Sequence, residues 1–296
     1  MLDLDPWIGR SITETERLDA RLVRWLAATL ERDELSVPRA GDTVPAGWHW
    51  ILFAPVARQS GLGRDGHPQK GDFLPPLEQP RRMFAGARLN WHRPFCVDMT
   101  VTRESMIRSC ERKSGRTGDM VFVTLGQRYF SEGILLLEED QDLVFRFDPG
   151  PDEVKALQAL GQRTRALAGQ APAFERSGAF QRSLSADPVM LFRFSAATFN
   201  GHRIHYDRDY ATQVEGYPGL VVHGFLLACL LLDHLERTVA PGAALERFSF
   251  KAKRPTFDLS PFCLHGDAPD SQGAVALWST NNVGEVAVDA HAVVRC

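Results

Sequence analysis

Hydrophobic positions near the beginning of the chain recur with helical spacing. Between Thr13 and Glu31, apolar side chains fall three or four residues apart, which is typical of an amphipathic helix. Thr13 is followed three residues later by Glu16, in the manner of a capping box. The sequence therefore predicts a helix over residues 13–31, with an apolar face formed by Leu18, Leu22, Trp25, Leu26 and Leu30.

The chain then becomes rich in glycine and proline before a series of short apolar segments begins. Trp48–Pro55 has a strand-like pattern, whereas residues 60–80 have the composition of a long loop. Long loops in compact enzymes often cover a site. Further along, alternating segments separated by turn residues predict an antiparallel meander. Its strands are expected at residues 95–103, 105–113, 120–131 and 133–138.

A composition typical of a linker separates two halves of the chain. Residues 147–183 are rich in Ala, Gln, Gly and Pro and show weak helical periodicity only around 154–167. We therefore expect two units, an N-terminal one over residues 1–165 and a C-terminal one over residues 166–296.

The second half repeats the order of elements expected in the first. An apolar segment at 189–195 and a polar loop at 196–209 precede a strongly apolar helix at 225–237. Each half thus runs from helix to antiparallel strands, which is typical of a duplicated α+β unit whose sheet wraps a helix. The strands of the second half are expected at residues 248–253, 261–265, 274–280 and 285–294.

Composition excludes several classes of protein. The formal net charge is −3 and no long basic run is present, so we expect no nucleic-acid partner. The five cysteines are spread singly, which favours a reducing compartment over a disulfide framework. Because the first ten residues lack a signal-peptide pattern and the longest apolar run, 225–232, is too short to span a bilayer, we expect a cytoplasmic protein with no membrane partner.

The chemistry-bearing residues gather in one polar loop and the start of the following helix. Phe199–Ala211 contains two histidines, an amide and several carboxylates, and Val222-His223-Gly224 precedes the apolar helix. Catalytic groups tend to lie on such loops when a rigid scaffold holds them. His202, His205, His223 and Asp207 are also residue types that ligate metals, but no zinc-binding spacing is present, and we expect no metal.

These residues resemble the MaoC-like hydratase/dehydratase family. The matching positions are Asn200, His205, Asp207, Ala211 and Val222-His223-Gly224. The string Phe199–Asp207 looks like the F-N-x-H-R-I-H-Y-D form shared by mitochondrial hydroxyacyl-thioester dehydratases and bacterial itaconyl-CoA and mesaconyl-C4-CoA hydratases, and Arg81–Gly86 resembles a first-half segment of that subgroup. The resemblance implies an α+β double hot-dog fold, with a degenerate first unit and the catalytic motif in the second.

The resemblance also implies roles for individual residues. His205 is expected to be the proton-transfer residue, and Gly224 with His223 is expected to bind the thioester oxygen at the helix start, where N–H groups and the helix dipole favour negative charge. Arg203 is a candidate for CoA phosphates or a distal carboxylate. The neighbouring Tyr206 and Asp207 complete the expected substrate-binding set.

One position departs from the family pattern. Asn200 stands where better-known hydratases have an aspartate that forms a dyad with the histidine. An amide cannot accept a proton at neutral pH. If the resemblance holds, His205 is the sole acid/base residue and Asn200 positions the water or polarises the substrate.

The resulting hypothesis is reversible hydration of an acyl-CoA thioester without a cofactor, the CoA ester being the substrate. A short branched dicarboxylic ester, itaconyl-CoA or mesaconyl-C4-CoA, is the favoured substrate. Two alternatives remain open: a 3-hydroxyacyl-thioester dehydratase of fatty-acid synthesis, and a non-catalytic hot-dog protein that only binds acyl groups. Two chains can in addition form a homodimer.

Overall fold

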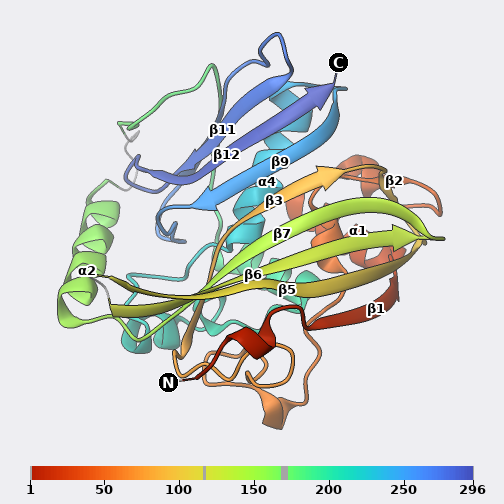
Figure 1. Ribbon diagram of the computed structural model, residues 1–296. Helices are drawn as coiled ribbons and strands as arrows, with labels where there is room; N and C mark the ends of the chain where they lie inside the picture. The colour runs from red at the N-terminus through yellow and green to blue at the C-terminus, as the bar shows by residue number, and fades with distance from the viewer. Residues whose placement is uncertain (1, 116–117, 168–172, 296) are drawn as a thin grey trace. The chain divides into compact units, whose positions relative to one another are not determined.

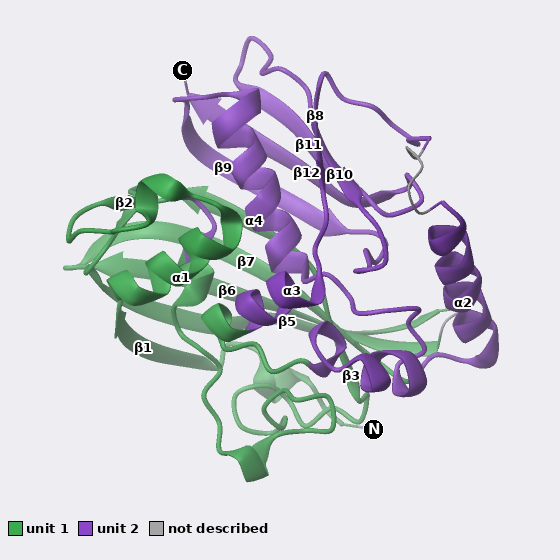
Figure 2. Cartoon of the chain, turned by 180° about the vertical axis from the view of Figure 1, so that it is seen from behind, with its two compact units in different colours: residues 1–44, 49–148, 196–202 green, residues 45–48, 149–195, 203–296 purple. Residues whose placement is uncertain are grey.

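The computed structural model describes residues 2–115, 118–167 and 173–295. The chain divides into two compact units, coloured separately in Figure 2. The first contains residues 1–44, 49–148 and 196–202, and the second contains residues 45–48, 149–195 and 203–296. The boundary predicted at residue 165 lies inside a helix of the second unit.

The first unit is built on a five-stranded antiparallel arrangement in the order β1-β5-β6-β7-β3 (Figure 1). Its helix α1 buries Val23, Leu26 and Leu30. The elements of this unit are β1 (Ser11–Arg17), α1 (Ala20–Leu30), β2 (Thr43–Val44), β3 (Arg81–Trp91), β4 (Phe95–Cys96), β5 (Thr100–Gly115), β6 (Gly118–Ser131) and β7 (Ile134–Arg146), with short 3-10 helices at Asp5–Trp7, Asp33–Leu35 and Gln59–Gly61.

The helix predicted over residues 13–31 begins later than expected. Residues 11–17 form strand β1, which pairs with β5, and the supposed capping residue Thr13 lies opposite Glu104 in that pairing. The alternating residue types of this segment, which include β-branched side chains, are typical of an edge strand. The true N-cap is Asp19, whose carboxylate accepts the N–H of Arg21 at 2.6 Å.

The strand predicted at Trp48–Pro55 is also wrong, because Trp48–Ile51 is a 3-10 helix. Two side chains of this 3-10 helix, His49 and Trp50, belong to a buried polar network. Trp50 Nε1 donates to Glu139 at 2.9 Å, His49 Nε2 lies 3.3 Å from the same carboxylate, and Tyr129 donates to it at 2.9 Å. Glu139 is 1% exposed, so these donors replace the water that a buried carboxylate loses.

The second unit repeats the arrangement with strands in the order β9-β12-β11-β10-β8. Helix α4 packs against β10, β11 and β12, and every side chain from Leu226 to His234 is buried. The elements are α2 (Pro151–Ala166), β8 (Phe180–Leu184), α3 (Pro188–Thr198), α4 (Gly224–His234), β9 (Ala244–Ala252), β10 (Phe262–Gly266), β11 (Ala274–Thr280) and β12 (Val286–Arg295), with a 3-10 helix at Arg203–His205 and π-helical turns at Tyr210–Val214 and Leu235–Val239.

Most expected elements of the meanders are confirmed, with shifted ends. The strand predicted at 274–280 matches β11, whereas the segments predicted at 95–103 and 105–113 share the single long strand β5. Strands β3 and β8 were not expected from the pattern. Among the described residues, the helices are too short or too polar to cross a bilayer.

Candidate active site

The sequence motif passes from one unit to the other along the chain. Helix α3 ends at Thr198, and Phe199 then takes a left-handed backbone conformation with φ of 49°. Asn200 and His202 belong to the first unit, and the 3-10 helix from Arg203 to His205 begins the part that belongs to the second.

His205 is held by its backbone surroundings in one tautomer. The ring is buried, with 6% of the residue exposed, and Nδ1 lies 2.7 Å from the carbonyl oxygen of Val221. Because a carbonyl can only accept, Nδ1 must carry the hydrogen and donate it. In neutral His205 the lone pair is therefore on Nε2, which gives this atom the capacity to take a proton.

His223 lies directly against His205. The two rings stack with centroids 3.6 Å apart and planes 19° apart. His223 Nε2 is 2.8 Å from the hydroxyl of Ser195, and its Nδ1 has no hydrogen-bond partner among the described residues. Burial, and secondarily the charge of His205, holds the pKa of His223 well below its usual value. His223 is therefore neutral at pH 7, and its ring forms one wall around His205.

The helix that follows His223 begins without a side-chain cap. His223 is the N-cap residue of α4 and makes no capping hydrogen bond with its side chain, and Gly224 is the first helical residue. Helix geometry leaves the first backbone N–H groups outside the intrahelical ladder. Together with the helix dipole, such groups favour a partial negative charge on an atom placed before them.

Arg203 and Asp207 are engaged with each other. Arg203 donates from Nε and Nη2 to Asp207 at 3.0 and 2.7 Å, and its guanidinium lies 4.2 Å from the centroid of the Tyr210 ring. The N–H of Tyr210 also donates to Asp207, and this bond together with Arg203 lowers the pKa of the Asp207 carboxyl. These contacts shape the turn after His205. A substrate-binding role for Arg203 and Asp207 stays a prediction.

Tyr206 and Asn200 occupy different surroundings. Tyr206 is 45% exposed, and partial burial raises the pKa of its hydroxyl. The side-chain oxygen of Asn200 accepts the N–H of His202 at 3.0 Å, which closes a tight turn. The Asn200 NH₂ group forms no hydrogen bond within the described chain. It can therefore donate to a water or a substrate oxygen, but it cannot take a proton.

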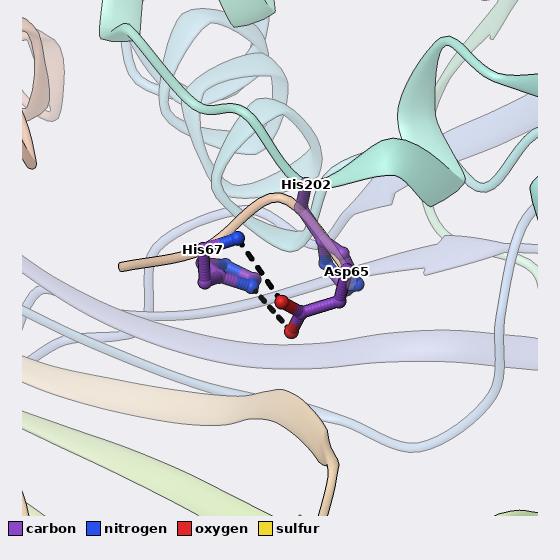
Figure 3. A group of neighbouring side chains, drawn as sticks. All are labelled: Asp65, His67 and His202. Atoms are coloured by element: carbon purple, nitrogen blue, oxygen red, sulfur yellow. Dashed lines mark hydrogen bonds and ion pairs between the residues drawn. The ribbon is translucent and has the colours of Figure 1, made fainter. Parts of the chain in front are cut away.

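A second group of titratable side chains lies around His202 in the first unit (Figure 3). Asp65 accepts two hydrogen bonds from His67, one from Nδ1 at 2.9 Å and one from the backbone N–H at 3.1 Å. The rings of His67 and His202 lie with centroids 4.4 Å apart. The sequence pattern of the long loop did not predict a role for Asp65 and His67. The signal that could have identified them is an aspartate and a histidine two residues apart among glycines.

Charges and burial act in opposite directions on this pair. Burial alone raises the pKa of Asp65, but the hydrogen bonds and charge of His67 bring it below the usual value. Burial lowers the pKa of His67, and the nearby charge of Arg82 acts in the same direction, against the effect of Asp65. At neutral pH the pair is therefore a carboxylate beside a neutral imidazole.

The same three side chains meet one geometric requirement for holding a metal ion. One donor atom from each of Asp65, His67 and His202 lies within 4.8 Å of the others. However, the Asp65 carboxylate already accepts two hydrogens from His67, and the positive charge of Arg82 opposes a bound cation. We therefore do not identify the cluster as a metal centre. His205 and His223, which the sequence had grouped with His202 as potential ligands, are not part of it.

Comparison with known proteins decides the family. The sequence profile described as hydroxyacyl-thioester dehydratase type 2 matches residues 47–258. The chain belongs to this family. It is accordingly a hydratase/dehydratase of acyl thioesters, a hydro-lyase, which confirms the reaction class predicted from the motif.

The sequence of one relative agrees with this assignment, and the likeness to one solved structure supports the fold alone. The mesaconyl-C4-CoA hydratase of Chloroflexus aurantiacus is 42% identical over 292 residues, which cover 94% of this chain and 97% of that protein. The structure of a MaoC-like dehydratase from Phytophthora capsici superposes with a TM-score of 0.71 at 13% identity, over 99% of this chain and 98% of that one.

The predicted double hot-dog fold is confirmed by a further likeness. A Mycobacterium tuberculosis protein described as having a double hot-dog fold matches with a TM-score of 0.58 at 15% identity, over 97% of this chain and 96% of that one. Each unit of this chain has the corresponding make-up of antiparallel strands and a helix.

Proposed function

We propose that this protein catalyses the reversible addition of water to a short, branched, dicarboxylic enoyl-CoA, with mesaconyl-C4-CoA as the favoured substrate. The proposal is supported by the 42% identity to a mesaconyl-C4-CoA hydratase over nearly the whole of both chains. The observation that carries the mechanism is the hydrogen bond from His205 Nδ1 to the Val221 carbonyl, because it leaves the lone pair of the neutral ring on Nε2.

In the hydration direction, His205 Nε2 takes a proton from water as the water oxygen forms a bond with the β-carbon. The π electrons move toward the α-carbon and the thioester carbonyl, so negative charge develops on the carbonyl oxygen. The α-carbon then gains the proton held by the His205 imidazolium, and the ring returns to its neutral form. The net change is one water added across the double bond, and dehydration follows the same steps in reverse.

Two further residues are proposed to act in this step: one stabilises the developing negative charge, and the other orients the water or the substrate. Gly224 begins α4, and its N–H is placed by helix geometry to donate to the thioester oxygen. The NH₂ group of Asn200 is suited to orient the attacking water or the substrate. Loss of one oxyanion donor typically lowers the rate by about 100-fold or more.

A panel of CoA esters tests the proposal. Mesaconyl-C4-CoA carries a carboxylate and a methyl group on its β-carbon, and 3-methylcrotonyl-CoA replaces that carboxylate with a methyl group. We expect kcat/KM for mesaconyl-C4-CoA to exceed that for 3-methylcrotonyl-CoA by at least about 100-fold, because a site built for a charged group rejects an analogue that lacks it. Itaconyl-CoA is the second dicarboxylic ester to include. Absence of turnover with all of these esters contradicts the proposal.

The description of the matching family supports a second candidate, dehydration of 3-hydroxyacyl thioesters in fatty-acid synthesis. This candidate predicts that long 3-hydroxyacyl groups on an acyl carrier protein are turned over faster than short CoA esters. The assignment of the chain to a hydro-lyase family weighs against the non-catalytic alternative.

A further inference from the structure

Arg82 is a positive charge on the apolar side of the sheet in the first unit. It lies directly opposite Phe145 in the pairing of β3 with β7, and side chains of residues paired in this way share one face of a sheet. Phe145 is 1% exposed and belongs to the apolar cluster of this unit. Phe84, two residues further along β3, packs against the same cluster. The side chain of Arg82 therefore leaves the sheet on the face that carries the core.

The long loop of residues 60–80 covers part of that face. Three apolar side chains of the loop pack on or within the same cluster, namely Phe73, Leu74 and Leu77. Lys70 Nζ lies 5.6 Å from the centroid of the Phe145 ring and is fixed by a hydrogen bond to a backbone carbonyl of the loop. The loop also carries Asp65 and His67. All of these residues belong to the first unit.

Arg82 forms no ion pair and no hydrogen bond within the described chain, although its charge acts on two groups of the loop. One is His67, and the other is Asp65, which attracts the guanidinium. Asp65 is not an ion-pair partner, because both of its oxygens accept hydrogen bonds from His67 instead (Figure 3). The five N–H donors of the guanidinium therefore have no acceptor in the part of the chain that the structure describes.

An unpaired guanidinium on this face is unfavourable for the folded protein. Burial lowers the pKa of Arg82, and the attraction of Asp65 offsets this effect only in part. Charged side chains that leave water are normally paired. Arg82 and His67 both keep part of their surface accessible, so a ligand from solution can reach them. An accessible cation that lacks a partner favours an anionic ligand.

The donor groups fit an oxyanion. A guanidinium group binds a carboxylate or a phosphate through two parallel hydrogen bonds. His67 donates from Nδ1 to Asp65, and its Nε2 forms no hydrogen bond within the described chain. When Nε2 is protonated it becomes a second donor toward an anion, and the Asp65 carboxylate stabilises the charged ring from the other side.

We propose that Arg82 and His67 form a binding site for a small oxyanion, a carboxylate or a phosphate group, under the loop of residues 60–80. The guanidinium donates two hydrogen bonds to the anion, protonated His67 donates a third, and Asp65 holds the ring in place. The site is contained in the first unit and requires no contact between the units. It is also independent of the proposed function, because it is measured as binding rather than as turnover.

Calorimetry of the wild-type protein with three separate probes tests the site. The probes are mesaconate for a carboxylate, inorganic phosphate for a phosphate, and free CoA for a phosphate carried by a larger ligand. We expect saturable binding of at least one probe that depends on Arg82. Dependence on Arg82 for mesaconate identifies a carboxylate ligand, and dependence for phosphate or CoA identifies a phosphate ligand. Absence of binding with all three probes contradicts the inference.

Substitution of Arg82 supplies the dependence. Arg82→Met removes the guanidinium but keeps a long side chain beside Phe145, and we expect the affinity for the probe to fall by at least about 10-fold. Arg93→Met is the matched control, because Arg93 is an exposed arginine just after β3. It should retain the wild-type affinity. Unchanged affinity in Arg82→Met overturns the inference.

A second variant keeps the test informative if Arg82→Met does not fold, as judged by circular dichroism. Arg82→Lys retains the positive charge but lacks the planar pair of donors, so we expect an affinity between those of the wild-type protein and Arg82→Met. Wild-type affinity in folded Arg82→Lys, together with a misfolded Arg82→Met, shows that the guanidinium does not recognise the anion and contradicts the inference.

The order of stabilities separates a binding residue from a structural one. Without an added anion, Arg82→Met should unfold at a higher denaturant concentration than the wild-type protein, because an unpaired charge has been removed from the apolar face. At a saturating anion concentration the difference should shrink or reverse, since only the wild-type protein gains stability from the ligand. An Arg82→Met protein that is less stable without the anion indicates a structural role and overturns the inference.

The His67 ring reports binding at the site itself. The charged and titratable groups around it are Asp65, Arg82 and His202, and Lys70 in turn acts on Asp65. Because a bound anion stabilises the imidazolium, the pKa of His67 should rise when the probe is added. Nuclear magnetic resonance of the histidine rings measures this change, with the His67 signal assigned from its absence in His67→Gln. An unchanged pKa of His67 at saturation places the anion elsewhere and contradicts the inference.

Discussion

Two histidines, one in each unit, have the same tautomer but different partners. Nδ1 of His205 donates to the carbonyl of Val221, whereas Nδ1 of His67 donates to the carboxylate of Asp65. The flat face of His205 stacks on a neutral ring, His223, at 3.6 Å, and that of His67 contacts His202 at 4.4 Å. A carbonyl determines which nitrogen carries the hydrogen. A carboxylate does this and also stabilises the ring once it is charged.

Asn200 replaces the motif aspartate, whereas an aspartate–histidine pair is present elsewhere in the chain. Asn200 stands at the usual position, but its amide oxygen only closes a turn with His202. Among the described residues, Asp65 and His67 form an aspartate–histidine pair in a loop more than a hundred residues earlier in the chain.

Replacing His205 should have the largest effect. His205→Asn keeps a donor for the Val221 carbonyl but removes Nε2, so we expect kcat to fall by about 10²- to 10⁴-fold with little change in thermal stability. Steady-state kinetics and the unfolding midpoint measure the two quantities. His291→Asn, at an exposed position of β12, is the control. If both variants retain activity, His205 does not transfer the proton.

Gly201→Ala should separate the motif segment from the loop of Asp65 and His67. Its new Cβ would lie 2.8 Å from the Gly66 carbonyl oxygen, and the segment must shift to relieve this contact. Because a displacement of about 1 Å can cost up to about 100-fold in rate, we expect kcat to fall by about 10- to 100-fold. Gly61→Ala, where nothing lies within 4 Å, should leave kcat unchanged. Equal kinetics for the two variants would show that the contact does not matter.

Ser195→Ala should affect stability more than catalysis. The Ser195 hydroxyl is 2.8 Å from His223 Nε2, and His223 Nδ1 has no partner within the described chain. Removing the hydroxyl leaves a fully buried imidazole unsatisfied, which typically costs about 1–3 kcal/mol. Denaturant unfolding should show this loss, whereas Ser183→Ala, at an exposed position of β8, should show none. A stable Ser195→Ala protein would mean that the hydroxyl contributes little to holding His223.

Acid should destabilise both regions through their histidines. The folded-state pKa values of His223 and His67 lie below the unfolded value near 6.5, so the unfolded chain binds more protons as the pH falls below 6.5. The unfolding free energy should therefore be highest above pH 6.5 and decrease below it, by up to about 1.4 kcal/mol per pH unit for each histidine. The pKa of Asp65 is lowered, so its contribution is lost only below about pH 4.

Denaturant titrations at several pH values measure this slope. His223→Gln should have a shallower slope between pH 6.5 and 5 than the wild-type protein, because the substituted side chain does not titrate. An unchanged slope would mean that His223 is not neutral in the folded state.

Local pattern determined much of this protein. The apolar periodicity of residues 225–237 predicted α4 and the π-helical turn after it. The alternation of residues 274–280 predicted β11. Both patterns are local, because a buried helix and a strand of a meander each have a characteristic spacing of apolar residues within one segment. The motif from Phe199 to Asp207 indicated the family and the reaction class from residue types and their spacing alone.

Tertiary structure decided what depends on partners distant in the chain. Residues 11–17 form a strand because their backbone pairs with the edge of β5, although the spacing of Thr13 and Glu16 resembled the start of a helix. The tautomer of His205 depends on a carbonyl 16 residues away, and the neighbourhood of His67 and His202 depends on a contact between glycines of two distant segments. A single sequence records propensity and residue type, but hydrogen-bond partners and close approaches between remote segments exist only in the folded chain.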